Sequence, residues 1–206
     1  MNEASEHAEL NKRAWDKRAD KFDRFGYFRF FQKRVVSLAR PQENGRFLDI
    51  GCGIGWAVRY AAGMVGARGE ACGIDISPKM IERATVNSPS LKNVHFYVAN
   101  AEALPFAENY FDYITCTQSF HHYLNPLNVL REVFRVLKPG KKIYILDPTA
   151  DVFIVRLFER RFSMKDSGHV KLYSTAEFKE MFTAAGLKWS GTRTIIPIMK
   201  VHIGEK

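Results

Sequence analysis

Residues 47–55 read Phe47-Leu48-Asp49-Ile50-Gly51-Cys52-Gly53-Ile54-Gly55, an apolar run followed by three glycines at alternate positions. The pattern predicts a buried strand that passes through a sharp turn into a helix, because glycine adopts the required backbone angles without strain. Glycine also lets a ligand approach the main chain closely. A dinucleotide fingerprint, G-x-G-x-x-G, would need glycine at position 56, where the chain has Trp56. The carboxylate of Asp49 inside the motif suits a cationic or amino-bearing ligand better than a pyrophosphate.

Strand and helix patterns alternate along the chain after this motif. Apolar runs predict further strands at 71–74, 94–98, 111–116 and 143–146. N-cap residues followed by proline, or by glutamate three residues on, predict helix starts at Ser77, Asn125 and Ser174. Two β-like runs around Pro197 predict a hairpin. We therefore expect an α/β fold, a mostly parallel sheet with helices on both faces and a C-terminal antiparallel hairpin.

Charge is unevenly distributed along the chain. Lys and Arg outnumber Asp and Glu by 31 to 22, so the formal net charge is +9. Residues 1–40 and 151–206 each carry 10 basic and 6 acidic side chains. Such a surface either attracts phosphates, anionic lipid headgroups or acidic metabolites, or forms solvated helix faces. The 3 cysteines lack metal-ligand spacing, which predicts reduced thiols in a cytoplasmic protein and no metal site. Neither a leader peptide nor a membrane span is expected.

A second carboxylate follows the next predicted strand, in the segment Gly73-Ile74-Asp75-Ile76-Ser77. Asp75 lies 20 residues after Gly55. Nucleotide-binding α/β folds place at this position an acid that accepts hydrogen bonds from the ribose hydroxyls. The alternative is an acid near a helix N-terminus, where the helix dipole favours negative charge. The glycine turn upstream favours ribose binding.

Four segments carry a resemblance to a known family: FLDIGCGIG (47–55), GIDISPKMIERA (73–84), NAEALPFAENYFDYITCTQSFHHY (100–123) and REVFRVLKPGKKIYILDP (131–148). In order and spacing they resemble the class I S-adenosylmethionine-dependent methyltransferases. Within these, the sequence is similar to the type 11 group typified by the ubiquinone and menaquinone biosynthesis enzymes. The resemblance covers about residues 10–190. It implies a Rossmann-like doubly wound sheet and this cofactor, and it leaves the substrate open.

The resemblance also implies how the chain is divided. We expect a single domain over residues 1–206, long enough to bury a large core. Its four parts would be a helical N-terminal cap at 1–40, a cofactor-binding core at 41–150, a substrate-cap insertion at 151–173, and a C-terminal helix and hairpin at 174–206. The alternative for the insertion is a helix packed on the domain.

Cofactor-binding residues follow from the same resemblance. Gly51, Gly53 and Gly55 would cradle the methionine portion of S-adenosylmethionine, or of its product S-adenosylhomocysteine. Asp49 would help hold the ammonium group, and Asp75 would bind the ribose. The implied set is completed by Cys52, Ile76, Asn100, Ala101, Glu102 and Thr117. Asn100 stands where the family usually has Asp, and its amide oxygen can still accept a hydrogen bond from the adenine amine.

Acceptor-side candidates are fewer. His121 and His122 follow the fourth strand and are the catalytic candidates, either as a general base or substrate ligand, or as a wall of the cofactor pocket. Phe22, His169 and Tyr173 would border the acceptor. Phe22 keeps the ring of the tyrosine that the family often has there but lacks its hydroxyl.

The expected activity is methyl transfer to a small molecule by in-line displacement, which needs alignment but neither a metal nor a covalent nucleophile. Arginines at 156, 160 and 161, mixed with apolar residues, suggest an acceptor that is both hydrophobic and anionic. No nucleic-acid partner is expected. Two alternatives remain open: a nucleic-acid or protein methyltransferase, which the basic ends allow, and a non-catalytic, cofactor-binding regulatory subunit.

Overall fold

The computed structural model describes residues 3–19, 22, 26–153, 155 and 171–206. In this part of the chain seven strands form one sheet, in the order β3-β2-β1-β4-β5-β7-β6. The strands are β1 (Arg46–Ile50), β2 (Glu70–Asp75), β3 (Val94–Val98), β4 (Phe111–Thr117), β5 (Leu137–Pro148), β6 (Lys188–Ile196) and β7 (Met199–Glu205). Strands β1 to β5 are parallel, and β7 runs antiparallel to β5 and β6. The expected mostly parallel sheet with a C-terminal hairpin is confirmed.

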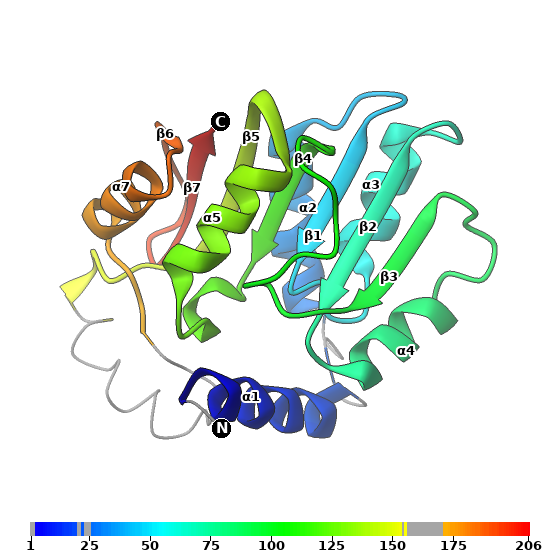
Figure 1. Ribbon diagram of the computed structural model, residues 1–206, viewed down its shortest axis with the longest axis horizontal. Helices are drawn as coiled ribbons and strands as arrows, with labels where there is room; N and C mark the ends of the chain where they lie inside the picture. The colour runs from blue at the N-terminus through cyan, green and yellow to red at the C-terminus, as the bar shows by residue number, and fades with distance from the viewer. Residues whose placement is uncertain (1–2, 20–21, 23–25, 154, 156–170) are drawn as a thin grey trace.

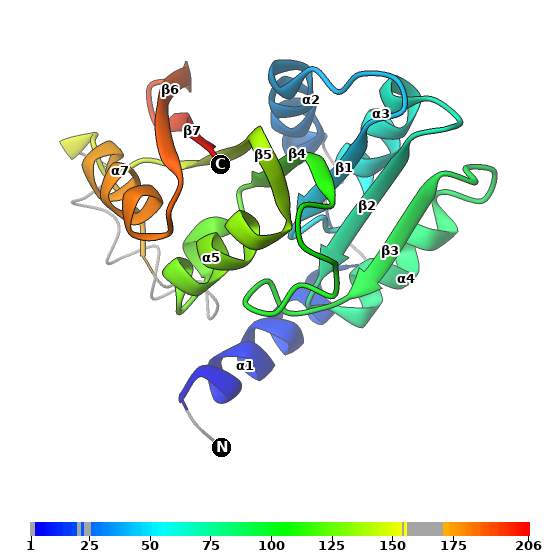
Figure 2. The same cartoon turned by 45° about the horizontal axis from the view of Figure 1, so that its top comes forward.

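Helices cover both faces of the sheet. They are α1 (Glu3–Arg18), α2 (Tyr27–Ala39), α3 (Trp56–Val65), α4 (Pro78–Val86), α5 (Pro126–Val136), α7 (Thr175–Ala184) and the short 3₁₀ helix η2 (Phe120–His122). Figure 1 shows α5 and α7 on one face, with α2 and α3 on the other. Helix α1 passes below the edge of the sheet at which β1 to β4 end, as Figure 2 also shows. No helix in the described ranges is both long and apolar enough to cross a membrane.

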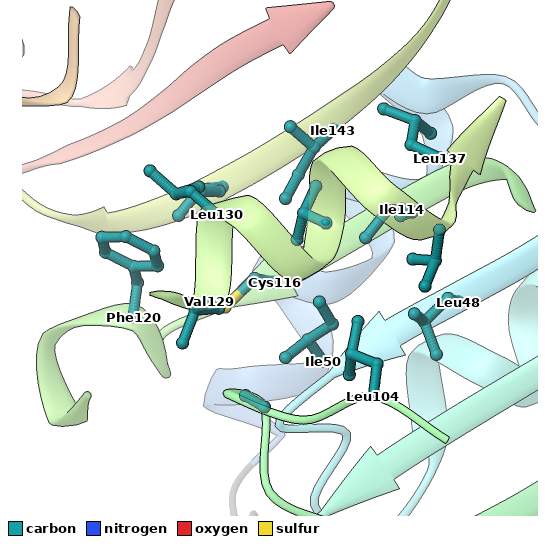
Figure 3. Close-up of a cluster of buried hydrophobic side chains, with 14 of the residues drawn as sticks. Leu48, Ile50, Leu104, Ile114, Cys116, Phe120, Val129, Leu130, Leu137 and Ile143 are labelled. Carbon is teal, nitrogen blue, oxygen red and sulfur yellow. The ribbon is translucent and has the colours of Figure 1, made fainter. Parts of the chain in front are cut away.

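The central strand β1 explains how the sheet is buried on both faces. Phe47, Leu48, Asp49 and Ile50 are all fully buried. Successive side chains of a strand point to opposite faces. Phe47 therefore packs with the buried side chains of α3, while Leu48 and Ile50 join the larger cluster beneath α5 (Figure 3). A strand covered on both faces is mostly apolar, as residues 47–50 are apart from Asp49.

Two local expectations require correction. The side chain of Asn125 makes no capping bond to α5, and its amide donates to the carboxylate of Glu102 instead. Strand β5 is longer than the expected 143–146, because it starts directly after α5 and continues past Pro139. Gly140 has a φ of 73° there, and the register shifts between Phe111 and Tyr113 on β4. Residues 137–142, which precede the expected strand, therefore belong to β5 as an irregular stretch and do not form a loop between α5 and the strand.

Most of the expected insertion at 151–173 lies outside the described residues, which resume at 171. The alternative that residues 152–162 form a helix also falls largely outside them. The division of the chain into four parts therefore stays a prediction.

Candidate active site

A pocket opens at the edge of the sheet where β1, β2 and β4 end. Its empty space is about 850 Å³, including the open mouth. The glycine turn after β1 and the ends of β2, β3 and β4 supply one side of the pocket, and residues of α1, α2 and their connection supply the other. The latter are His7, Ala8, Asn11, Trp15, Phe22, Phe28 and Gln32. Open α/β sheets bind their ligands at this edge.

The glycine turn follows a path that side chains would obstruct. Gly51, Gly53 and Gly55 have φ values of 72°, 52° and 76°. A Cβ on Gly51 would lie 2.1 Å from the Ser119 Oγ, and one on Gly53 would lie 3.0 Å from the Phe22 ring. The N–H groups of Gly51 and its neighbour Cys52 both donate to the Ile74 carbonyl at 2.9 Å, which fixes the turn to β2. Gly51 and Gly53 line the pocket.

Asp75, the last residue of β2, also lines the pocket. Its Oδ2 accepts a hydrogen bond from the Gly53 N–H and its Oδ1 one from the Ser77 N–H, both at 2.9 Å. Burial raises the pKa of Asp75 to about 6, although these two amides act to lower it. Each carboxylate oxygen has a second lone pair. The carboxylate is thus held in place and can still accept bonds from a ligand.

Asp49 lies behind the turn and does not line the pocket. It is fully buried, and its Oδ1 accepts a 2.6 Å hydrogen bond from the Thr115 hydroxyl. Its Oδ2 has no hydrogen-bond partner among the described residues. Burial raises the pKa of Asp49 to about 7. An ionisable group with such a raised pKa beside a pocket is typical of functional sites.

The segment after β3 forms the next wall, with Asn100, Ala101 and Glu102 in the lining. The amide oxygen of Asn100 accepts a 3.0 Å hydrogen bond from the Glu102 N–H, a turn within the loop. Glu102 in turn accepts from the Asn125 side chain at 3.0 Å. These contacts hold the loop in shape and leave the second lone pair of the Asn100 oxygen available.

The end of β4 carries two buried acceptor atoms. The Thr117 hydroxyl and the Gln118 Oε1 have no hydrogen-bond partner in the described ranges, and both residues line the pocket. Gln118 has a φ of 53°, and its amide group donates to the Tyr27 hydroxyl at 3.2 Å. Buried polar atoms of a pocket that lack protein partners are natural contacts for a ligand.

The two histidines of η2 have different surroundings. His122 is buried, lines the pocket and meets the Trp15 ring edge-on, with centroids 5.1 Å apart. His121 lies outside the lining. Its ring Nδ1 is 2.9 Å from the Asp147 Oδ1, and its main-chain N–H donates to the Oδ2 of the same carboxylate at 2.8 Å. Asp147 therefore fixes His121 at the end of β5.

Helix α1 is tied to the sheet by polar contacts at two points. The Asp16 Oδ1 accepts a 2.5 Å hydrogen bond from the Ser77 hydroxyl and a 3.3 Å one from the Lys79 N–H, at the start of α4. Near the other end, the side chains of His7 and Asn11 both lie 3.0 Å from the His122 carbonyl oxygen. These contacts place Trp15 and its neighbours over the pocket.

The residues predicted to border the methyl acceptor do not share one location in the structure. Phe22 lines the pocket and stacks on Phe28, with centroids 4.6 Å apart. Tyr173 is buried against Phe120 and Phe178 in the core and is not in the lining. His169 and the arginines at 156, 160 and 161 lie outside the described residues.

Residues 17–189 match the family described as a methyltransferase domain. The chain belongs to this methyltransferase family. The predicted resemblance and the predicted Rossmann-like fold are therefore both confirmed. In the part of the methyltransferase that the structure describes, no group of three His, Cys, Asp or Glu side chains is arranged to hold a metal ion.

Named relatives agree with the family. This methyltransferase is 29% identical over 216 residues to a demethylmenaquinone methyltransferase of Staphylococcus epidermidis, covering 91% of this chain and 89% of the relative. It is 33% identical over 133 residues to the ubiquinone/menaquinone biosynthesis C-methyltransferase UbiE of Edwardsiella ictaluri, covering 63% and 53%. Among solved structures, a SAM-dependent methyltransferase from Aquifex aeolicus is similar, with 25% identity, a TM-score of 0.74, and coverage of 92% and 97%.

The methyltransferase brings most of the predicted cofactor residues to one pocket. Five of the predicted site residues that the structure describes are not part of the lining: Asp49, Cys52, Gly55, His121 and Tyr173. Sequence reasoning missed the polar residues of α1, above all His7 and Asn11. The only signal was their helical spacing from Trp15, which places Asn11 four residues before it on the same face.

Proposed function

We propose that this methyltransferase uses S-adenosylmethionine to methylate a small aromatic acceptor of the quinol type. Support for a small molecule comes from the pocket itself, which is covered by α1 and lined on that side by Trp15, Phe22 and Phe28. Support for the quinol class comes from the names of the relatives in Staphylococcus epidermidis and Edwardsiella ictaluri, a demethylmenaquinone methyltransferase and a ubiquinone/menaquinone biosynthesis C-methyltransferase. The anionic group expected from the arginines at 156, 160 and 161 remains part of the proposal.

The residues of the pocket fit the cofactor. Three glycines with positive φ leave a main-chain cradle, and Asp75 offers two fixed carboxylate oxygens. The unpartnered Thr117 hydroxyl lines the pocket and is suited to an amino-bearing group, and Asp49, buried behind the glycine turn, would help hold that group through the neighbouring main chain. Gly51 and Gly53 would contact the methionine portion, Asp75 the ribose, and Ile76 with Asn100 and Ala101 the adenine. Glu102 would border the adenine from the same loop.

When bound, the cofactor supplies a methyl group already activated by a sulfonium. The protein therefore has to hold the acceptor in line with the C–S bond and exclude water. The rings of Trp15, Phe22 and Phe28 would enclose an aromatic acceptor. We assign His122 to the wall of the pocket, because its ring packs against Trp15 and its carbonyl holds α1. We assign no proton transfer to His121, which Asp147 holds beside the pocket.

The observation that carries this proposal is the Asp75 carboxylate, fixed by two main-chain amides at the pocket edge. Calorimetric titration of the purified protein with S-adenosylmethionine should show binding at one site. Incubation with reduced 1,4-naphthoquinone should then yield S-adenosylhomocysteine. Binding without turnover on any metabolite would favour a regulatory subunit, and turnover on RNA or protein alone would favour the other alternative. We propose a cytoplasmic location on the basis of three buried free thiols, Cys52, Cys72 and Cys116.

A further inference from the structure

Asn11 is a buried polar residue on the helix that covers the pocket. Its exposed fraction is 6%, and it lines the pocket from the side opposite the glycine turn. Its Nδ2 lies 3.0 Å from the His122 carbonyl oxygen and 3.0 Å from the His7 Nε2. The NH₂ group of the Asn11 side chain therefore attaches α1 to η2.

The same contacts fix which way the amide faces. A carbonyl oxygen can only accept, so the NH₂ group of Asn11 has to face His122, whichever tautomer His7 adopts. The Oδ1 then faces the other way. It is buried, and no described residue donates a hydrogen bond to it. An unpaired buried acceptor is unfavourable, so one in the wall of a pocket is suited to a donor from the ligand.

Gln118, which also lines the pocket, has the same arrangement. Its NH₂ group donates to the Tyr27 hydroxyl, while its Oε1 is buried and unpartnered in the described part of the chain. Both free atoms are acceptors, so both require a donor on the ligand. The rings of Trp15 and Phe22, 6.2 Å apart and edge-to-face, supply apolar area beside Asn11. The aromatic rings favour a flat, apolar ligand. The buried acceptor atoms beside them favour a ligand that also carries a hydrogen-bond donor.

We propose that Asn11 Oδ1 forms a subsite that accepts a hydrogen bond from a hydroxyl or amino group of the methyl acceptor. Asn11 is thus a specificity-determining residue, which favours phenols and aromatic amines over their ethers and over hydrocarbons of the same shape. This inference rests on the proposed function for the identity of the ligand as a methyl acceptor. The subsite itself is tested by binding alone.

The test compares 1-naphthol with naphthalene, which differ by a single hydroxyl donor. Binding of each to the full chain is measured by calorimetry, with and without S-adenosylhomocysteine. We expect 1-naphthol to bind the wild-type protein at least about tenfold more tightly, as one satisfied hydrogen bond predicts. In Asn11→Leu, which has a similar volume and no acceptor, the two affinities should become equal.

Asp16→Ala is the matched control, because it removes the other attachment of α1, at the start of α4, and leaves Asn11 and the residues that line the pocket unchanged. It should keep the wild-type preference for 1-naphthol. Equal losses of preference in both variants would mean that Asn11 acts only by attaching α1, and would overturn the proposal. An unchanged preference in Asn11→Leu would overturn it as well.

A second comparison needs no substitution. Wild-type protein should bind 1-naphthol more tightly than 1-methoxynaphthalene, whose oxygen cannot donate, and equal affinities would overturn the subsite. Failure of the proposed function is recognised separately. It would appear as absent S-adenosylhomocysteine binding while the preference for 1-naphthol persists.

Discussion

The main-chain N–H of Gly53 donates a 2.9 Å hydrogen bond to the Oδ2 of Asp75, 22 residues further along the chain. This bond joins the turn after β1 to the end of β2 at the atom proposed to bind the ribose. Because the Ser77 N–H holds the other oxygen, the carboxylate has one fixed orientation before any ligand arrives. Such preorganisation lowers the entropic cost of binding.

Replacement of Asp75 by Ala should weaken binding of S-adenosylmethionine by on the order of 1–3 kcal/mol, the value of hydrogen bonds to a charged group. Because the pKa of Asp75 is raised to about 6, wild-type affinity should also fall as the pH drops below 6. Calorimetry at several pH values measures both effects. Unchanged affinity in the Ala variant would remove Asp75 from the site.

A side chain on Gly53 should abolish cofactor binding and leave a folded protein. In Gly53→Val a branched side chain has to adopt a φ of 52° with its Cβ 3.0 Å from Phe22. Gly63→Ala is the control, because a Cβ there meets no atom within 4 Å and lies in helix α3. The control should bind normally and gain about 0.5–1 kcal/mol of stability. Thermal unfolding and calorimetry together check both variants, and normal binding by Gly53→Val would contradict the cradle.

Asp49 should make the protein less stable at high pH. Burial raises its pKa from 3.8 to about 7 in the folded protein, so folding favours the protonated form. The stability that this group contributes is full below pH 3.8 and is lost as the pH rises through 7. Asp49→Asn keeps an acceptor for Thr115 and removes the charge. Its free energy of unfolding at pH 8 should exceed that of the wild type by on the order of 2 kcal/mol.

Urea unfolding at pH 8, 6 and 4.5 measures this difference, which should shrink as the pH falls. A difference that does not change with pH would contradict the raised pKa. The same variant should bind S-adenosylmethionine less tightly, because the proposed partner of its ammonium group has lost its charge. A gain in stability together with a loss in affinity is the expected pattern for a residue kept for function.

His122→Ala distinguishes a wall from a base. Loss of a packing contact with Trp15 should lower turnover and cofactor affinity together, each by less than about tenfold, whereas loss of a general base would cut turnover alone by about 10²–10⁴-fold. The His122 carbonyl remains in the variant, so the attachment of α1 is kept. Steady-state rates and calorimetry on the same preparation decide between the two roles.

Local patterns were enough to predict the sheet and the glycine turn at its edge, whereas the wider set of cofactor residues came from the family resemblance and stays a prediction. The apolar run at 47–50 and the glycines that follow specify a strand and a turn within nine residues, and Asp75 ends the next such strand. The contacts of α1 could not be predicted from local patterns, because they join residues that are far apart in the chain. Asn11 meets His122 across 111 residues of sequence, and no local pattern specifies that encounter.

Tyr173 shows the same dependence on tertiary packing, in this case for a residue that the sequence did single out. Its place after the fifth strand suggested a border of the acceptor site. Its main chain forms an isolated bridge to Thr149, and its ring packs against Phe120 and Phe178 and is 7% exposed. Tertiary packing decides whether the side chain of a loop residue faces the core or a pocket, and the local sequence pattern does not predict this.

Strand β7 lies between β5 and β6, although it follows both in the chain. On the ribosome, β6 is therefore synthesised before the strand that pairs with it on its inner side. Until residues 199–205 have emerged, β5 presents an open edge, and β6 has no place in the sheet that the structure describes. Open strand edges invite pairing with other chains. This half of the sheet thus cannot assemble in the order of its synthesis, and its completion depends on β7, which is made after both of the strands that it joins.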